Sequence, residues 1–370
     1  MMTPVLFKKA SYDYETLRPL IFDMIEQIGS LNIRNNMRIL IKPNLLLPAK
    51  PEKAILTHPL LVKAVTEYVL ECGGRPVISD SPAMGSFEKI LKEGGYAEAF
   101  KDVDVEFKRF EISEKVDIGA PFGKIEIAKG AVEADIVINL AKLKTHAQML
   151  LTLGVKNLFG CIVGLRKPEW HLRSGIDREM FATLLVKIYA AVNPSITIID
   201  GVLAMEGQGP GKSGLSRDVG VIVGSRSAFA LDRAICQMIG IDPDNLPTNK
   251  AARQLGFFTC DVQVKGDFIV IQNYKLPDMG KVMFGPKPVQ RIIRKHMLQR
   301  PVVDPNLCEL CSECWRYCPA KAIVPGKKRV VFDYDKCIRC YCCLEVCPHG
   351  ALHAKETLPG KVIRRLSLGN

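Results

Sequence analysis

Short apolar runs alternate with amphipathic stretches along most of the chain, from about Leu6 to Gly280. The runs are rich in β-branched residues, and the stretches between them repeat apolar residues at helical spacing. The runs predict strands at 37–41, 75–79, 134–140, 195–199 and 219–223. The stretches between them predict helices at 16–28, 59–72, 86–93, 178–192 and 227–239. This alternation is typical of an α/β domain.

The predicted strands IVINL and ITIID are almost wholly apolar. Strands of this kind are covered on both faces, so we expect a mostly parallel sheet with helices on both faces. In such sheets, ligands bind outside the carboxyl ends of the strands. The residues that follow each apolar run are therefore the first candidates for a functional site.

The pattern changes near residue 280. The segment 276–306 carries several prolines and a basic, helix-like patch at 289–300, and it is interpreted as a connector. Residues 301–354 then form two halves offset by 29 residues, each predicted to contain a loop, a short helix and a pair of strands. We therefore expect an α/β domain at 1–280, a connector at 281–300, a small repeated domain at 301–354 and a tail at 355–370.

Two near-identical cysteine runs lie in the repeated domain and contain eight of the thirteen cysteines of the chain. The spacing C-x2-C-x2-C-x3-C-P, found in each run, wraps thiolates around a 4Fe-4S cubane. In paired runs the fourth cysteine ligates the other cluster. One predicted cluster is therefore held by Cys308, Cys311, Cys314 and Cys347, and the other by Cys337, Cys340, Cys343 and Cys318. The domain should be a bacterial-ferredoxin-like α+β fold that moves single electrons.

Structural zinc and disulfides are the alternatives. A zinc ribbon separates two C-x2-C pairs, whereas three cysteines recur here at every third residue, twice. Disulfides need an oxidising compartment, and the first ten residues show no apolar core followed by a cleavage site. Cys342, between two predicted ligands, is interpreted as a packed thiol beside the cluster. Oxygen-labile clusters suit an anaerobe or a reducing cytosol.

Composition limits the class of protein. The chain has 370 residues, 48% of them apolar and 24% charged, which is typical of a globular protein of two domains. No apolar run approaches the roughly 20 residues of a membrane-spanning helix, so a soluble, cytoplasmic protein is expected. The net charge of +12 favours anionic partners. Nucleic acid is disfavoured, because the basic residues are spread along the chain and only 7% of residues are aromatic.

Five polar segments lie at the predicted strand ends: 42–44, 80–82, 142–146, 154–160 and 200–210. If these edges converge, they form a cleft in which crowded ammonium groups lower one another's pKa, as acid/base catalysis by lysine requires. The candidate catalytic residues are Lys144, His146, Lys142, Lys156, Asp80 and Asp200. The candidate substrate-binding residues are Lys42, Asn44, Asn157 and Glu206.

Each of these residues also has a purely structural explanation. An aspartate at a strand end often caps the next helix, glycine-rich loops often serve turns alone, and a single lysine is usually solvated. The sequence Gly209-Pro210-Gly211-Lys212-Ser213-Gly214 fits a dinucleotide motif literally, but a predicted strand follows it where such a site needs a helix. A nucleotide site is therefore disfavoured.

These segments together resemble the domain-of-unknown-function family numbered 362. The resemblance covers about residues 3–275 and is carried by KPN (42–44), DSP (80–82), NLAKLKTH (139–146), LGVKNLFG (153–160), DGVLAMEGQGP (200–210) and ALD (230–232). Members of this family are often joined to a two-cluster ferredoxin module and are mostly described as iron-sulfur proteins. The resemblance supports the predicted fold and domain division, and it names no substrate.

The sequence favours an iron-sulfur oxidoreductase that passes electrons through two 4Fe-4S clusters to a small anionic substrate in the Lys/His-lined cleft. A ferredoxin or flavodoxin is the expected electron donor. One alternative is a non-catalytic electron-transfer protein or a subunit of a redox complex. Another is a non-redox isomerase or lyase with structural clusters. No flavin motif is visible, although a flavin at the domain junction stays open.

Overall fold

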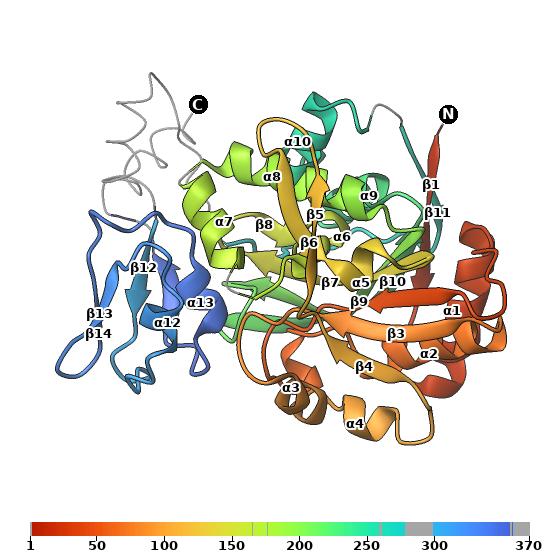
Figure 1. Ribbon diagram of the computed structural model, residues 1–370, viewed down its shortest axis with the longest axis horizontal. Coiled ribbons are helices and arrows are strands. Elements are labelled where there is room, and N and C mark those ends of the chain that lie inside the picture. The colour runs from red at the N-terminus through yellow and green to blue at the C-terminus, as the bar shows by residue number, and fades with distance from the viewer. Residues whose placement is uncertain are drawn as a thin grey trace.

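The computed structural model describes residues 2–164, 166–175, 177–258, 261–277, 299–355 and 357. Its centre is a nine-stranded sheet in the order β11-β1-β10-β9-β7-β2-β3-β4, with β8 paired to β7 (Figure 1). The neighbours from β9 to β4 run parallel, whereas β10 lies antiparallel to both β9 and β1. The predicted mostly parallel sheet is therefore confirmed, with an antiparallel pairing near one edge.

The strands of this sheet are short at its edges and long at its centre. They are β1 (Thr3–Lys9), β2 (Arg38–Lys42), β3 (Arg75–Asp80), β4 (Glu106–Arg109), β7 (Ile136–His146), β8 (Leu150–Thr152), β9 (Ile196–Gly207), β10 (Gly214–Ser225) and β11 (Val262–Gly266). A separate antiparallel hairpin consists of β5 (Ser113–Asp117) and β6 (Lys124–Ala128).

Helices cover both faces of the sheet, as the apolar strands require. One face packs against α1 (Tyr14–Ile28), α2 (Pro59–Glu71), α3 (Phe87–Glu93) and α4 (Tyr96–Ala99). The other packs against α5 (Lys129–Val132), α6 (Gly154–Asn157), α7 (Arg166–Ser174), α8 (Arg178–Val192), α9 (Ala228–Met238) and α10 (Pro247–Gln254). Ile39 and Ile41 of β2 enter the first core, and Leu40 between them enters the second. No helix within the described ranges is long and apolar enough to cross a membrane.

Two central strands are longer than their apolar patterns predict. β7 continues through Lys142, Lys144 and His146, where a loop is expected from the polar residues. The extension pairs with β8, and β10 pairs with β9 as far as Gly207, so backbone groups beyond the apolar segments have ladder partners. The polar side chains are thus fixed by strand geometry, which is more rigid than a loop.

The described part of the C-terminal region, residues 299–355, is called here the cysteine module. It contains β12 (Arg300–Val303), α12 (Glu313–Arg316), β13 (Ile323–Pro325), β14 (Val330–Phe332), α13 (Cys342–Val346) and β15 (Leu352–Lys355). β12 pairs with β15 and β13 with β14, both antiparallel. The predicted connector at 281–300 lies almost wholly outside the described residues, and so does the predicted tail at 355–370.

The internal repeat is visible in the backbone. Backbone torsions with positive φ recur at the same 29-residue offset as the cysteines. The first half has them at Leu310, Ser312 and Lys321, and the second at Arg339, Tyr341 and Gly350. Each cysteine loop therefore follows the same path in both halves.

The cysteine module lies beside the sheet edge at which β7 and β9 end, with α13 facing the large domain (Figure 1). The Ser213 hydroxyl donates to the carbonyls of Gly350 and Leu352. A Cβ on Gly211 would lie 2.9 Å from the Leu344 carbonyl oxygen of α13, and one on Gly209 would lie 2.3 Å from the Thr145 carbonyl oxygen. The glycines of the Gly-Pro-Gly segment thus permit close packing of β7, this loop and the module.

Candidate functional site

A cavity of about 60 Å³ lies where the carboxyl edge of the sheet meets the cysteine module. Its polar wall from the large domain consists of Lys42, Asn44, Asp80, Ser81, Lys144, His146, Thr152, Lys156, Asn157, Lys167 and His171. The module contributes Tyr317, Cys342 and Glu345. The structure therefore brings seven of the predicted catalytic or substrate-binding residues of the large domain to one place.

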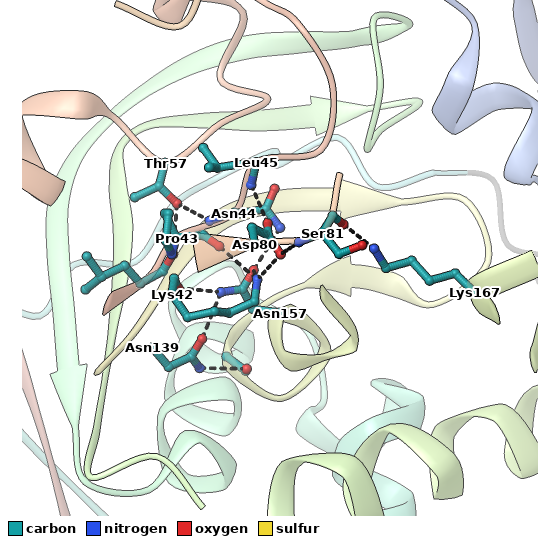
Figure 2. Close-up of polar contacts among 12 residues, drawn as sticks. Lys42, Pro43, Asn44, Leu45, Thr57, Asp80, Ser81, Asn139, Asn157 and Lys167 are labelled. Atoms are coloured by element: carbon teal, nitrogen blue, oxygen red, sulfur yellow. Dashed lines mark hydrogen bonds and ion pairs between the residues drawn. The ribbon is translucent and has the colours of Figure 1, made fainter. Parts of the chain in front are cut away.

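Lys42 and Asp80, at the ends of β2 and β3, form a buried ion pair in the wall of this cavity (Figure 2). The Lys42 Nζ lies 2.9 Å from the Asp80 Oδ1 and donates to the Pro43 carbonyl at 2.8 Å. The Asp80 carboxylate also accepts from the backbone amides of Leu45 and Ser81 at 2.7 and 2.8 Å. Asp80 thus both neutralises a buried lysine and orders the two loops beside it.

A chain of amide side chains positions the next lysine. Asn44 Nδ2 donates to Asn157 Oδ1 at 2.8 Å, and Asn157 Nδ2 donates to Asn139 Oδ1 at 2.8 Å (Figure 2). Asn139 in turn donates to the Gly154 carbonyl at 2.9 Å. The side-chain oxygen of Asn44, Oδ1, accepts a hydrogen bond of 2.7 Å from Lys144 Nζ. Lys144 Nζ also donates to the Ile55 carbonyl at 2.8 Å. Within the part of the chain that the structure describes, Lys144 is therefore held by neutral oxygens alone.

The segment LGVKN presents Lys156 because α6 is fixed at its start. Asp232 accepts from the amides of Gly154 and Val155 at 2.8 and 3.2 Å, and so satisfies the first two donors of the short helix. A Cβ on Gly154 would lie 2.8 Å from the Ala228 Cβ. Gly154 and Asp232 are thus both needed to hold the start of α6 in the position that places Lys156 in the wall.

Burial lowers the pKa of three lysines in the wall. The pKa of Lys144 falls well below its usual value, because the side chain is buried and Lys156 repels it. Burial also lowers the pKa of Lys156, and it lowers that of Lys167 to about 8. Lys167 Nζ donates to the Ser81 carbonyl. An ammonium group with the pKa of Lys167 can exchange protons near neutral pH.

His146 at the end of β7 meets Glu345 of α13 across the domain junction, with 3.0 Å between Nε2 and Oε1. The alignment is poor for a hydrogen bond, and both atoms lack one within the described part of the chain. The backbone amides of Gln148 and Met149 both point at His146 Nδ1, at 3.1 and 3.2 Å. Nδ1 must therefore be the unprotonated nitrogen, which leaves the proton of the neutral ring on Nε2, facing the cavity.

The pKa values of this contact agree with a neutral imidazole beside an ionised carboxylate. Burial lowers the pKa of His146 to about 4, and the lysines Lys156 and Lys144 contribute to the same shift. Burial would raise the pKa of Glu345, but the contact with His146 and the electrostatic interactions with Lys156 and His171 together outweigh it, and the pKa falls to about 2. His146 is thus a donor at neutral pH, and Glu345 an acceptor.

Two buried polar atoms face the cavity without a hydrogen-bond partner among the described residues: Thr152 Oγ1 and His171 Nδ1. Both side chains belong to residues that are only 3% exposed. His171 lies on α7, where it packs at 4.4 Å from the Phe181 ring, and burial lowers its pKa to about 3. Buried polar atoms without partners are uncommon, and at a cavity wall they are available to a ligand.

Three predicted site residues lie elsewhere. Lys142 Nζ pairs with Asp200 at 2.8 Å and donates to the Tyr12 hydroxyl at 3.0 Å, and neither charged group lines the cavity. Glu206 pairs with Arg217 at 2.8 Å, also away from it. The Lys142–Asp200–Tyr12 network is fully hydrogen-bonded and joins β7, β9 and the N-terminal segment. Its geometry is that of a structural contact.

Sequence analysis missed several residues of the wall. Lys167 and His171 lie four residues apart on α7, a spacing that places both on one helix face and that could have been noticed. Thr152 lies on β8, a strand that the apolar pattern does not predict. Tyr317 and Glu345 come from the module, and no local signal indicates that they reach the sheet edge.

The predicted cluster ligands gather in two further cavities of the module. One is lined by Cys308, Cys311, Cys314 and Cys347, and the other by Cys318, Cys337, Cys340 and Cys343. The backbone amides of Ala322 and Ala351 donate to the sulfurs of Cys318 and Cys347, each at 3.3 Å. All twelve cysteines in the described ranges have free thiols, and no three His, Cys, Asp or Glu side chains there are close enough to share a single metal ion. Four thiols around each cavity fit the predicted cross-ligated clusters.

Cys342 connects this part of the module to the large domain. It lines the second cysteine cavity and also the lysine-lined cavity, where Tyr317 and Glu345 stand beside it. Its side chain is 1% exposed. The second cluster site is thus the one that adjoins the lysines, whereas Cys311 of the first site is exposed.

Comparison with known proteins assigns both parts of the chain. The domain of unknown function DUF362 matches residues 39–237, and a 4Fe-4S dicluster domain matches residues 300–348. The pyruvate synthase subunit PorD of Thermotoga maritima is 37% identical over 59 residues, which cover 16% of this chain and 60% of the relative. The chain therefore carries two 4Fe-4S clusters and takes part in electron transfer.

A relative that covers most of this chain is a thylakoid-associated protein from Synechocystis, 35% identical over 81% of this chain and 96% of its own length. The lactate racemase apoprotein of Thermoanaerobacterium thermosaccharolyticum aligns with a TM-score of 0.36 and 13% identity, over 59% of this chain and 54% of that one, which is too distant for any argument about function. The two matched domains and the near full-length relative place the chain in one family. It belongs to the DUF362 family, in a form joined to a dicluster ferredoxin-type domain.

Proposed function

We propose that the protein is an iron-sulfur oxidoreductase that reduces a small anionic substrate in the lysine-lined cavity. The observation that carries this proposal is the position of the second cysteine cavity, because Cys342 forms part of its wall and part of the lysine-lined wall. An electron-carrying site and a binding site thus share a boundary. A protein that only carried electrons would have no need of buried lysines at that boundary.

The roles of the wall residues follow from their chemistry. Lys144 and Lys156 bind the anionic group, because their ammonium groups lack a carboxylate within ion-pair distance in the described part of the chain. Asn44 and Asn157 orient Lys144. His146 donates a hydrogen bond from Nε2 to the substrate and keeps its proton, with Glu345 beside the ring. Lys167, whose pKa burial lowers to about 8, delivers the proton that the reduction needs. The clusters supply single electrons.

The electron donor approaches the exposed side of the module. Cys311 of the first predicted cluster is exposed, whereas every cysteine of the second set is buried or partly buried. A reduced ferredoxin or flavodoxin is the donor that suits this arrangement, and the net charge of +12 favours an acidic protein partner. A cytoplasmic location is part of the same proposal.

Reoxidation of the reduced clusters tests the proposal. The protein is reduced without air and mixed with small anionic metabolites in turn, and the visible absorbance of the clusters reports electron loss. We expect one class of anion to reoxidise the wild-type clusters, and Lys144→Met to abolish that reaction without changing the cluster spectrum. Lys89→Met is the matched control, because Lys89 is exposed and makes only a surface pair with Glu93. Equal rates in Lys144→Met and wild type would contradict the proposal.

An electron-transfer subunit is the second candidate. It is favoured by the similarity of the module to PorD, which is a subunit of pyruvate synthase. In that case the large domain is a docking scaffold, and electron transfer from donor to acceptor protein is unchanged in both lysine variants. The same pair of variants therefore separates the two candidates.

A further inference from the structure

The charges in the lysine-lined cavity do not balance. Among the described residues, four lysines line it, Lys42, Lys144, Lys156 and Lys167, but only two carboxylates do, Asp80 and Glu345. Asp80 is committed to Lys42 at 2.9 Å, and Glu345 faces His146 at 3.0 Å. With neutral histidines and all four lysines protonated, the wall carries two more ammonium groups than carboxylates. A buried charge without a partner is costly, so a ligand with two negative charges is the natural complement.

The free polar atoms of the wall are mainly donors. Lys156 Nζ has no hydrogen-bond or ion-pair partner among the described residues, and its nearest aromatic contact is the Phe159 ring at 5.9 Å. His146 Nε2 carries the ring proton and faces the cavity. Thr152 Oγ1 and His171 Nδ1 have no partner there either, and both can donate. A donor-rich wall selects a ligand rich in acceptor oxygens.

The cavity also limits the size of the ligand. Its volume is about 60 Å³, and one water molecule needs roughly 10–15 Å³ of such space. Roughly four to six non-hydrogen atoms therefore fit. Leu46, Phe159 and Pro210 close the apolar part of the wall. The enclosed part of the cavity therefore suits a compact ligand.

We infer that the cavity binds a compact oxyanion with two negative charges and roughly six or fewer non-hydrogen atoms, such as a dicarboxylate of the size of oxalate or a tetrahedral oxoanion. This inference rests on the proposed function, since it names the substrate class of the same site. Lys144 and Lys156 neutralise the two charges, and Thr152, His146 and His171 donate to the oxygens.

Binding should be linked to proton uptake. Burial lowers the pKa of Lys144 and Lys156, so at any given pH each side chain is less protonated than an exposed lysine. A bound dianion favours the ammonium form and raises both pKa values. The binding heat at pH 8.5 should therefore depend on the ionisation enthalpy of the buffer, with protons taken up on binding.

Isothermal titration of the oxidised, cluster-loaded protein tests the inference without any electron donor. The probes are oxalate and sulfate as compact dianions, formate and nitrate as compact monoanions, and citrate as a large anion. We expect at least one compact dianion to bind about tenfold or more tightly than both monoanions, with no binding of citrate. Proton uptake should accompany the dianion.

Variants show whether such binding occurs in this cavity. Lys156→Met should weaken the dianion about tenfold or more, whereas the exposed control Lys89→Met should leave its affinity unchanged. Thr152→Val keeps the shape of the side chain and removes one donor, so it provides a second test if Lys156→Met fails to fold. Equal binding of monoanions and dianions, binding of citrate, no binding of either dianion, or wild-type affinity in the cavity variant that folds would each overturn the inference.

The reductase proposal and the dianion inference can be refuted independently of each other. A protein that binds a compact dianion in this cavity but whose reduced clusters are not reoxidised by any anion refutes the reductase proposal alone. A protein whose clusters are reoxidised by a monoanion in a Lys144-dependent reaction, and which binds neither dianion, refutes the dianion inference alone.

Discussion

Two buried histidines and one partly buried histidine should make the stability of the fold sensitive to mild acid. Burial lowers the pKa of His58 and His146 to about 4 and that of His171 to about 3. The surroundings of the rings agree with neutral imidazoles. Nδ1 of His58 accepts from the Leu60 amide, and Nδ1 of His146 accepts from two amides. In the unfolded chain each ring has a pKa near 6.5.

The direction in which stability changes with pH follows from the number of protons that the folded and unfolded chains bind. Between pH 6.5 and about 4, the unfolded chain binds a proton at each site that the folded chain does not. The stabilisation is therefore complete above pH 6.5 and is lost as the pH falls towards the folded values. At pH 5.5, which is roughly one unit below the unfolded pKa, each ring has lowered the free energy of unfolding by about 1.4 kcal/mol. For all three rings the loss is about 4 kcal/mol. Because the folded values lie well below 5.5, this figure depends little on them.

The titration of Asp232 changes the stability of the fold in the opposite direction to that of the histidines. Burial raises its pKa to about 7, although the Gly154 and Val155 amides pull in the other direction. The folded chain therefore gains a proton between pH 8 and pH 5.5, which stabilises it by about 2 kcal/mol. Between pH 8 and pH 5.5, the wild-type chain should therefore lose about 2 kcal/mol of its free energy of unfolding. Asp232→Asn abolishes the opposing titration, so its loss over the same interval should be about 4 kcal/mol.

Urea unfolding at pH 8 and pH 5.5, without air and followed by far-ultraviolet circular dichroism, measures both losses. His171→Phe is the matched variant, because phenylalanine suits the ring cluster of Phe159 and Phe181 and cannot titrate. This substitution should reduce the decrease in the free energy of unfolding between pH 8 and pH 5.5 by about 1.4 kcal/mol. Equal stability of Asp232→Asn at the two pH values would refute the reasoning.

Three further predictions concern single contacts. Asp80→Asn leaves Lys42 without its ion-pair partner and should destabilise the fold by about 3–5 kcal/mol in thermal unfolding, and a midpoint equal to wild type would contradict this. Gly211→Ala places a Cβ 2.9 Å from the Leu344 carbonyl oxygen and should speed hydrogen exchange in α13, with unchanged exchange as the contrary result. Cys311→Ser should lose about half of the iron while Cys342→Ser retains it, and equal iron loss in both would refute the ligand assignment.

The parts of the fold that were predicted are those with a local signal. The β-branched runs gave the central strands, because a strand buried on both faces must be apolar along its length. The cysteine spacing indicated the cross-ligated sets, since ligand loops of a cubane are short and regular. The long extensions of β7 and β9 were not predicted, because their polar residues are stabilised by pairing with β8 and β10. These partners follow directly in the chain, but their pairing segments are short or weakly patterned in sequence.

The site was predicted in part for the same reason. Lys42, Asp80, Lys144 and Lys156 were expected at converging strand ends, where the structure places them. Lys142 was expected beside Lys144 but pairs with Asp200, because the register of β7 against β9 shifts between the two lysines. No pattern in a single sequence reveals such a shift. The contribution of Glu345 depends on how the module docks, which is a property of two surfaces far apart in the chain.

The position of the module also explains why the lysines can remain buried. Lys144 and Lys156 have no carboxylate of their own in the described part of the chain, so burial alone would favour their neutral forms. A cubane held by four thiolates is anionic, and the site predicted for one lies just beyond Cys342. Negative charge there offsets part of the desolvation of both ammonium groups, and they in turn favour the reduced, more negative cluster. Each domain thus supplies the charge that the other lacks, so the lysine-lined cavity depends on the cluster-loaded module for both its walls and its electrostatics.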